Sequence, residues 1–280
     1  MKLPTAFLLM SCVMCVKPLV RAEAFRVDDA AFAYRLPQQV PDSSPRRVMV
    51  LFGGRDWPGE KTLAAYSFGG LADRHGLVLL SPSFTKGEYW EPAGGSGDTL
   101  KKALVHVCRL AGFADDGRLP ELYLHGYSAG GQCANLFYAW MPDEVTAWGA
   151  HACGVYGKAA KVKGKIQTEG KGLVPALVTC GTEDTERHAI SRQFAYAYRE
   201  QGGDLLWKPF QGMDHALERD ALAFAEAWFD ALLSGEGIRF IGEDDTGRIL
   251  PVSEAEWIDI EFRNPLTNEA IRDRWSATTN

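Results

Sequence analysis

The residues best placed to do chemistry lie in the segment His125-Gly126-Tyr127-Ser128-Ala129-Gly130-Gly131. This segment follows a short apolar run at 121–124 and precedes a stretch at 133–140 whose apolar side chains share one helical face. A glycine two residues before Ser128 and another two residues after it allow a sharp turn from strand to helix. Such a turn holds the serine hydroxyl up toward a substrate. The pattern therefore predicts a nucleophilic serine, with a simple glycine-rich turn as the alternative.

Serine is a poor nucleophile at neutral pH, so it needs a base and an acid group that orients the base. On a strand–turn–helix scaffold of this kind the expected chain order is serine, acid, histidine. Asp184 lies just beyond the apolar run at 175–179, and Glu183 beside it is the chemically competent alternative. His215 lies just beyond the run at 205–210. We therefore predict that Ser128, Asp184 and His215 act together.

The remaining five histidines fit this chain order less well. A metal site can be imagined from His151, Cys153, Cys180 and His188, but their spacings match no zinc pattern. We expect neither a metal nor a cofactor.

An acyl-transfer reaction also needs backbone donors for the negative oxygen that forms on the substrate. The amide of Ala129, directly after the nucleophile, is one expected donor. The second is expected from the turn Phe52-Gly53-Gly54-Arg55, where Gly54 and Arg55 both remain open. Aromatic side chains on the nearby loops and at the serine turn are candidates for lining the substrate, or for ordinary packing: Trp57, Tyr89, Trp90 and Tyr127.

These residues need a scaffold of alternating strands and helices. Apolar runs at 48–52, 77–80, 122–124, 175–179 and 205–210 suit strands buried on both faces of a parallel sheet. Helical patterns separate them, including one in which Leu222, Ala225, Phe229 and Leu232 share a face. We therefore predict an α/β sandwich with a mostly parallel sheet over residues 25–235. Residues 236–280 read as a small β-rich appendage, with short apolar runs around 239–242, 248–252 and 257–262 and a final helix ending near Trp275.

The first 24 residues have the composition of a secretory leader. Lys2 precedes an apolar stretch at 3–16, and Ala22-Glu23-Ala24 suits a signal peptidase. Cleavage after Ala24 would leave 27 basic and 35 acidic residues, a net charge of −8, which makes nucleic acid an improbable partner. The apolar stretch is shorter than a membrane-spanning helix requires. We expect export to the periplasm or beyond, with no membrane span after the leader is removed.

Four cysteines remain after residue 24, an even number in an oxidising compartment. Sequence alone allows three pairings. We expect Cys153 with Cys180, which follow strands predicted to be adjacent, and Cys108 with Cys133, on helices that flank the serine strand.

With these residues in hand, the chain resembles the α/β-hydrolase superfamily over residues 45–235. More narrowly it resembles secreted esterases of the polyhydroxybutyrate depolymerase and feruloyl-esterase-like group, through the segment from Gly126 to Gly131. The resemblance implies a cofactor-free acyl-enzyme mechanism in which Ser128, Asp184 and His215 form a triad. The chain departs from well-marked members because Phe52-Gly53-Gly54-Arg55 stands where they carry His-Gly-Gly-Gly.

The function expected from the sequence is hydrolysis of a carboxylic ester, either a small molecule or one linked to a polymer. Peptidases of the prolyl-oligopeptidase type and the dienelactone-hydrolase-like branch share the same serine turn. A peptidase is therefore one alternative, and a catalytically silent fold used for binding is another.

Overall fold

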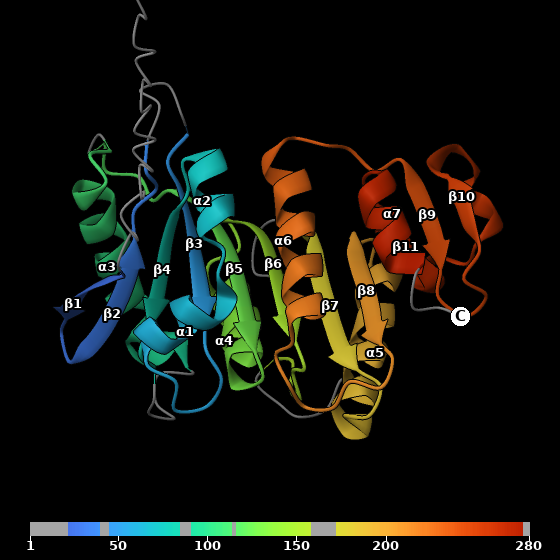
Figure 1. The fold of residues 1–280 in the computed structure, drawn as a ribbon, viewed down its shortest axis with the longest axis horizontal. Coiled ribbons are helices and arrows are strands. Elements are labelled where there is room, and N and C mark those ends of the chain that lie inside the picture. Colours follow the sequence, from blue (N-terminus) through green and yellow to red (C-terminus); the bar gives the residue numbers. More distant parts are fainter. Residues whose placement is uncertain (1–21, 40–44, 85–90, 114–115, 158–171, 277–280) are drawn as a thin grey trace, which may run out of the picture.

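The central feature of the molecule is an eight-stranded sheet with the strand order β1-β2-β4-β3-β5-β6-β7-β8 (Figure 1). The structure is a computed structural model, and it describes residues 22–39, 45–84, 91–113, 116–157 and 172–276. β2 runs antiparallel to both of its neighbours, and the strands from β4 to β8 pair in parallel. The strands are β1 (Glu23–Val27), β2 (Ala30–Arg35), β3 (Arg47–Phe52), β4 (Val78–Pro82), β5 (Glu121–Tyr127), β6 (Val145–His151), β7 (Ala176–Gly181) and β8 (Leu205–Phe210).

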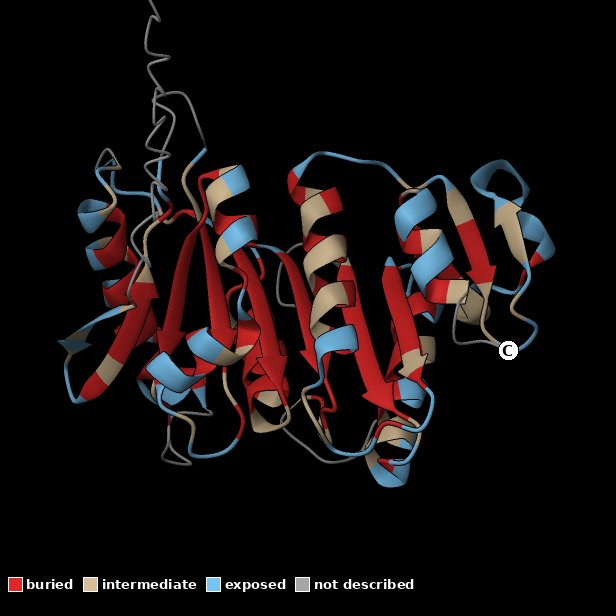
Figure 2. Ribbon diagram, viewed as in Figure 1, coloured by how far each residue is buried: buried red, intermediate tan, exposed pale blue. Residues whose placement is uncertain are grey.

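Helices cover both faces of this sheet, and the strands from β3 to β8 are almost entirely buried, whereas β1 at the edge is largely exposed (Figure 2). One face carries α3 (Ser96–Leu110), α4 (Ala129–Trp140) and α5 (Thr185–Glu200). The other carries α1 (Gly59–Tyr66), α2 (Gly69–His75) and α6 (Arg219–Leu233). The expected α/β-hydrolase sandwich with a mostly parallel sheet is confirmed.

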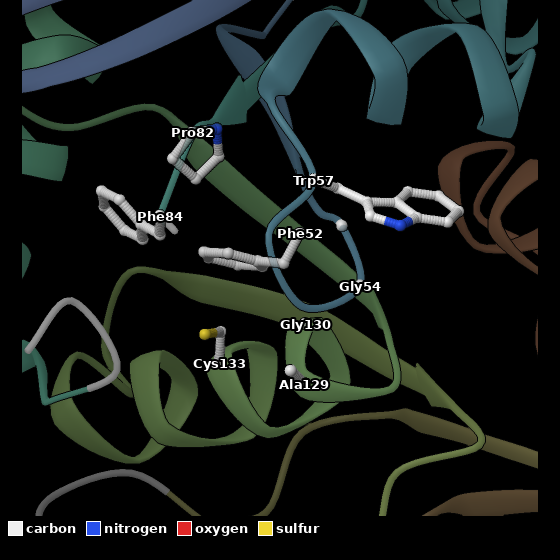
Figure 3. Close-up of a pocket in the computed structure, with 9 residues that line it drawn as sticks. Phe52, Gly54, Trp57, Pro82, Phe84, Ala129, Gly130 and Cys133 are labelled. Carbon is white, nitrogen blue, oxygen red and sulfur yellow. The ribbon is translucent and has the colours of Figure 1, made fainter. Parts of the chain in front are cut away.

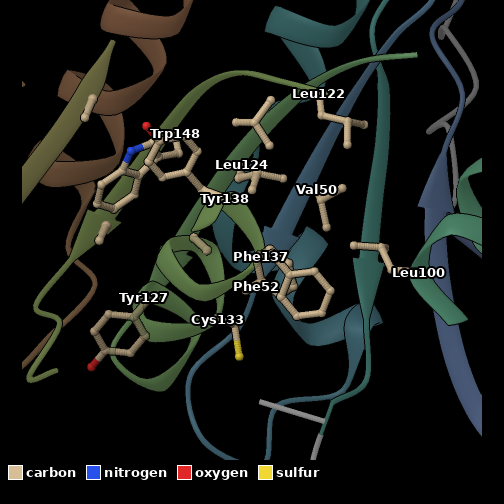
Figure 4. Close-up of a cluster of buried hydrophobic side chains, with 14 of the residues drawn as sticks. Val50, Phe52, Leu100, Leu122, Leu124, Tyr127, Cys133, Phe137, Tyr138 and Trp148 are labelled. Atoms are coloured by element: carbon tan, nitrogen blue, oxygen red, sulfur yellow. The ribbon is translucent and has the colours of Figure 1, made fainter. Parts of the chain in front are cut away.

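Alternating side chains along each strand supply the two cores. Val50 and Phe52 of β3 point into the core beneath α3 and α4, where they meet Leu100 and Phe137 (Figure 4). Met49 and Leu51 of the same strand point into the opposite core. Because both faces are covered, a run that is apolar at every position is the stable choice for this strand.

The five apolar runs expected to form strands correspond to β3, β4, β5, β7 and β8. Three strands were not among those runs. β6 has the sequence VTAWGAH, whose small and polar residues break the apolar run, although Trp148 fills the core beneath it. β2 is short and rich in alanine, which favours helices in isolation, so its strand state depends on pairing with β4. β1 is a short, largely exposed edge strand that pairs with β2.

The C-terminal segment forms a second, antiparallel sheet of the expected β-rich kind. Its strand order is β10-β9-β11, with β9 (Phe240–Glu243), β10 (Ile249–Pro251) and β11 (Arg263–Leu266), followed by α7 (Glu269–Ser276). The prediction of an extended run at 257–262 is wrong. That segment ends one short 3-10 helix and forms another, and the strand begins only at Arg263. Trp257 and Ile260 are exposed, so within the described part of the chain their side chains gain little from burial that would favour an extended run there.

A buried arginine joins this appendage to the main sheet. The Arg199 guanidinium donates to Asp244 Oδ2 at 2.6 Å and to Asn264 Oδ1 at 2.6 Å, both in the appendage. Its Nε donates to the carbonyl of Leu205 at the start of β8. A charge this deeply buried is stable only when it is well paired, and each of the three guanidinium nitrogens has an acceptor. The appendage is therefore packed on the main sheet.

The predicted leader lies mostly outside the described residues. β1 begins at Glu23, so cleavage after Ala24 would remove the first two residues of that strand, including the Glu23 carboxylate that accepts from the Tyr34 hydroxyl. None of the helices in the described ranges combines the length and apolar composition needed to cross a bilayer. Export and the leader stay predictions.

Both predicted disulfides are wrong, because all four cysteines of the described ranges are free, buried thiols. Cys108 lies near Arg46, which precedes β3, whereas Cys133 lines a pocket at the other end of that strand with Phe52. A strand of six residues spans roughly 20 Å, far beyond a disulfide. The Cys153 thiol donates to its own loop, at Val155 O, and the Cys180 thiol is directed at Asp184.

Candidate active site

Ser128 stands at the junction of β5 and α4 with a strained backbone. Its φ is 55° and its ψ is −119°, values that a residue with a side chain rarely adopts. Three backbone hydrogen bonds hold this conformation: the Ser128 N–H donates to His151 O at 2.9 Å, and Ser128 O accepts from the N–H groups of Gly131 and Gln132. The serine hydroxyl is thereby raised above the carboxyl end of the sheet, as the turn chemistry of the sequence predicted.

The glycines on either side of Ser128 are required by close backbone contacts. A Cβ on Gly126 would lie 1.9 Å from Gly130 O, and one on Gly130 would lie 2.2 Å from Phe52 O. Both neighbours are backbone atoms that cannot rotate away. No larger residue fits at either position without moving β3 or β5.

The structure brings Ser128, His215 and Asp184 together in one line of hydrogen bonds. Ser128 Oγ lies 3.0 Å from His215 Nε2, and His215 Nδ1 lies 2.7 Å from Asp184 Oδ2. Each residue follows a different strand: β5, β8 and β7 respectively. The Asp184 side chain is 6% exposed and that of His215 is 34% exposed. The carboxylate is therefore shielded, while the imidazole edge that faces Ser128 is open to a substrate.

The two adjacent carboxylates, Asp184 and Glu183, differ in burial and in what they contact. Asp184 is buried and reaches His215, whereas Glu183 is exposed and contributes only its backbone, whose N–H donates to Met213 O. The second oxygen of Asp184 accepts from Arg187 Nη1 at 2.9 Å. Asp184 is thus held between a histidine on one side and a guanidinium on the other.

Two residues behind the serine and the histidine were not expected from the sequence to support the site. The Tyr127 hydroxyl donates to His215 O at 3.0 Å, and its ring stacks on that of His215 at 5.4 Å. His151 Nε2 lies 2.7 Å from Ala216 O. Tyr127 was proposed to line the substrate, and His151 was considered only as a base or a metal ligand. No pattern in the sequence places either one beside the loop of His215.

A small pocket adjoins Ser128 on the side of α4 (Figure 3). Gly54 and Ala129, two of the three predicted oxyanion donors, both line it, whereas Arg55 is exposed and does not. Away from Gly54 the pocket ends on Phe52, Phe84 and Cys133, all of which are buried. The pocket is therefore apolar at its inner end and is lined by backbone near the serine.

Of the predicted substrate-lining aromatic residues, Trp57 lies in this pocket, with its ring 5.5 Å from that of Tyr127. Tyr127 itself is turned toward His215 and His151 rather than into the pocket. Tyr89 and Trp90 lie outside the described residues.

The free energy of unfolding is expected to fall as the pH drops below 6.5, because two histidines are buried in neutral form. Burial lowers the pKa of His125 to about 3 and that of His151 to about 4. Between these values and 6.5 the unfolded chain binds protons that the folded chain does not, so acid favours unfolding. At pH 5 each histidine is expected to remove about 2 kcal/mol.

Urea unfolding of the parent and of His125→Leu at pH 7 and pH 5 tests this expectation. The variant lacks one of the two groups, so its loss of stability between the two pH values should be about 2 kcal/mol smaller. An equal loss in both proteins would show that His125 is not held neutral.

Comparison with solved structures agrees with the architecture. An esterase from Pyrobaculum calidifontis superposes with a TM-score of 0.58 at 16% identity, covering 77% of this chain and 86% of the esterase. An S-formylglutathione hydrolase from Staphylococcus aureus gives 0.56 at 13% identity, covering 76% of this chain and 97% of the hydrolase. A ferulic acid esterase gives 0.55 at 15% identity, covering 76% and 97%.

No protein-family model and no curated protein sequence matches the chain. The structural similarity, at these low identities, establishes the fold. The chain has the α/β-hydrolase fold, and the solved structures it is similar to include esterases and serine hydrolases.

Proposed function

We propose that this protein is a serine hydrolase that cleaves a carboxylic ester through an acyl-enzyme intermediate. One observation carries the proposal: Ser128 Oγ, the His215 ring and the Asp184 carboxylate are joined by contacts of 3.0 and 2.7 Å at the carboxyl edge of the sheet. A serine, an imidazole and a buried carboxylate in this geometry activate the hydroxyl for attack on a carbonyl.

In the first half of the reaction, Ser128 Oγ attacks the carbonyl carbon of the ester while its proton passes to His215 Nε2. Asp184 holds the imidazole in the tautomer that accepts this proton and stabilises the resulting cation. The N–H groups of Ala129 and Gly54 are proposed to donate to the negative oxygen of the tetrahedral intermediate. The imidazolium then protonates the leaving alcohol, which departs and leaves the acyl group on Ser128.

In the second half, water replaces the alcohol. His215 takes a proton from the water as it attacks the acyl carbon, and a second tetrahedral intermediate forms that carries a hydroxyl in place of the alkoxy group. Its collapse breaks the bond to Ser128 Oγ, which regains its proton from His215. The products are one alcohol and one carboxylic acid, and the protein is unchanged.

The pocket beside Ala129 favours esters of short acids. Its inner end is occupied by Phe52, Phe84 and Cys133, so an acyl chain directed into it meets buried side chains after a few carbons. Similar folds described as esterases, arylesterase and ferulic acid esterase support ester rather than peptide cleavage. The leaving alcohol, on the open side of His215, can be small or part of a polymer.

Hydrolysis of p-nitrophenyl esters from acetate to octanoate tests this proposal. We expect turnover of the acetate, with kcat/KM at least about tenfold lower for the octanoate, because one or more unaccommodated methylenes cost roughly 1 to 3 kcal/mol. Cys133→Ala should narrow this difference by removing the buried sulfur, while Cys108→Ala, far from the pocket, should not. Equal rates along the series would contradict the assignment of the pocket, and cleavage of a peptide p-nitroanilide alone would favour a peptidase.

The proposal includes export of the mature chain. It is supported by Lys2, the apolar stretch at 3–16 and the small residues Ala22 and Ala24. N-terminal sequencing of protein recovered outside the cytoplasm should begin at Phe25, and a sequence that still contains the apolar stretch would contradict it.

A further inference from the structure

The loop that carries His215 is irregular, and residues on neighbouring strands hold it in place. After β8 ends at Phe210, residues 211–218 form turns and bends before α6 begins. Gln211, Gly212 and Asp214 are exposed, as is His215 itself. Within the loop, the Ala216 N–H donates to Asp214 O at 2.9 Å across His215, but this backbone bond does not reach the imidazole that lies 3.0 Å from Ser128 Oγ. The position of the ring must therefore be set by contacts to the loop from outside it.

Two side chains make such contacts with consecutive carbonyl groups of the loop. The Tyr127 hydroxyl donates to His215 O at 3.0 Å, and His151 Nε2 donates to Ala216 O at 2.7 Å. Tyr127 ends β5 and His151 ends β6, the two adjacent strands next to the nucleophile. Figure 4 shows the Tyr127 hydroxyl directed away from the apolar cluster beneath it. These two hydrogen bonds link the carbonyl groups of His215 and Ala216 to the ends of β5 and β6.

The protonation state of His151 follows from its partners. A carbonyl oxygen only accepts, so Nε2 must carry a proton to bond Ala216 O. Nδ1 lies 2.7 Å from Thr179 Oγ1 and accepts the hydroxyl proton of that residue. The ring is 1% exposed, and burial keeps it neutral. Thr179 on β7 thus selects the tautomer in which His151 can hold the loop.

His151 also touches the nucleophile. Its carbonyl accepts the N–H of Ser128 at 2.9 Å, which is one of the bonds that hold the strained serine backbone. Its ring stacks on Tyr127, which in turn stacks on His215. One residue therefore bonds both to the serine through its backbone and to the histidine loop through its side chain, so it fixes the distance between them.

We propose that His151, oriented by Thr179 and assisted by Tyr127, is a positioning residue that sets His215 within reach of Ser128. It does not touch the substrate. The inference rests on the proposed function, because the distance it sets matters only if Ser128 and His215 exchange a proton.

The experiment compares two equally buried histidines. His151→Leu removes the bond to Ala216, and His125→Leu removes a neutral histidine that is also 1% exposed, on adjacent β5, but bonds Tyr66 and not the loop. We expect His151→Leu to lower kcat for p-nitrophenyl acetate by about 10²-fold with KM changed less than about twofold, because small misplacements of reacting groups carry costs of this size. His125→Leu should keep kcat within about threefold of the parent, although both variants lose stability.

Two further variants keep the test decisive if His151→Leu does not fold. His151→Gln retains an N–H donor near Nε2 and should recover kcat to within about tenfold of the parent. Tyr127→Phe removes one hydroxyl and should lower kcat by about three- to tenfold, the usual size for one neutral hydrogen bond. Equal kcat losses in the two leucine variants, or full kcat in Tyr127→Phe together with no difference between Gln and Leu at 151, would overturn the proposal.

Labelling with a fluorophosphonate separates failure of this inference from failure of the proposed function. If the parent is labelled and turns over ester but the variants at 151 and 127 behave like the His125 control, only the positioning role is overturned. If the folded parent neither labels nor turns over, the hydrolase proposal fails, and the positioning role fails with it.

Discussion

Replacing His215 with alanine is expected to lower kcat for p-nitrophenyl acetate by about 10⁵- to 10⁶-fold, with KM nearly unchanged. His215 Nε2 is 3.0 Å from Ser128 Oγ, and among the residues that the structure describes no other side chain is hydrogen-bonded to that hydroxyl to take its proton during attack. Steady-state kinetics of the parent and of His215→Ala give kcat and KM for each protein, and thermal unfolding shows whether both are folded at the assay temperature. The residual rate should remain above that of water, because the proposed oxyanion donors are untouched.

His106→Ala is the matched control for the loss of a histidine. His106 is exposed on α3, and its ring lies against Phe25 on the far edge of the sheet. Its kcat should equal that of the parent. A His215→Ala variant that folds and retains more than a tenth of the parental kcat would show that another group is the base.

The change of Asp184 to asparagine is expected to lower kcat by about 10⁴-fold. An amide nitrogen facing His215 Nδ1 would donate rather than accept, which places the imidazole proton on Nε2 and leaves Ser128 without an acceptor. The same change removes the anion that pairs with Arg187 at 2.9 Å. Kinetics with p-nitrophenyl acetate, beside thermal unfolding of both proteins, separate the catalytic loss from any loss of stability.

Glu183→Gln is the matched control at the adjacent residue, because Glu183 is exposed and does not reach the histidine. Its kcat should change by less than about twofold. If Glu183→Gln were the more damaging change, the orienting acid would be misassigned, and the buried position of Asp184 would need another explanation.

The sequence predicted the parts of the fold in which one local signal dominates. β3 is apolar at every position after Arg47, and β4 and β8 each begin with three apolar residues; such runs suit a sheet covered on both faces. β6 and the strand at 263–266 lack that signal, since their strand state comes from the neighbours with which they pair. A local pattern cannot report a partner that is distant in sequence.

The residues of the candidate site also separate into those that a local sequence pattern can predict and those that only the folded structure brings together. The turn around Ser128 and the order serine, acid, histidine are properties of the chain, so the three side chains that the structure brings together could be named in advance. Their catalytic role stays a prediction. The contact of His151 with Ala216 joins residues 65 positions apart, and only the folded sheet places them together.

The cysteines show the opposite case. An even count and an expected oxidising compartment favoured two disulfides, but neither argument contains any geometry. Burial raises the pKa of the Cys153 thiol to about 12 and that of Cys108 to about 11, so both are poor thiolates as well as being unpaired in the structure.

The central claim is that Ser128 is a nucleophile, and covalent labelling with a fluorophosphonate tests it most directly. Intact mass measurement of the parent should show addition of one phosphonyl group, with the modified peptide mapping to Ser128. Ser128→Ala, verified as folded by circular dichroism, should gain none. Absence of labelling in the folded parent, or a label on any residue other than Ser128, would contradict the account.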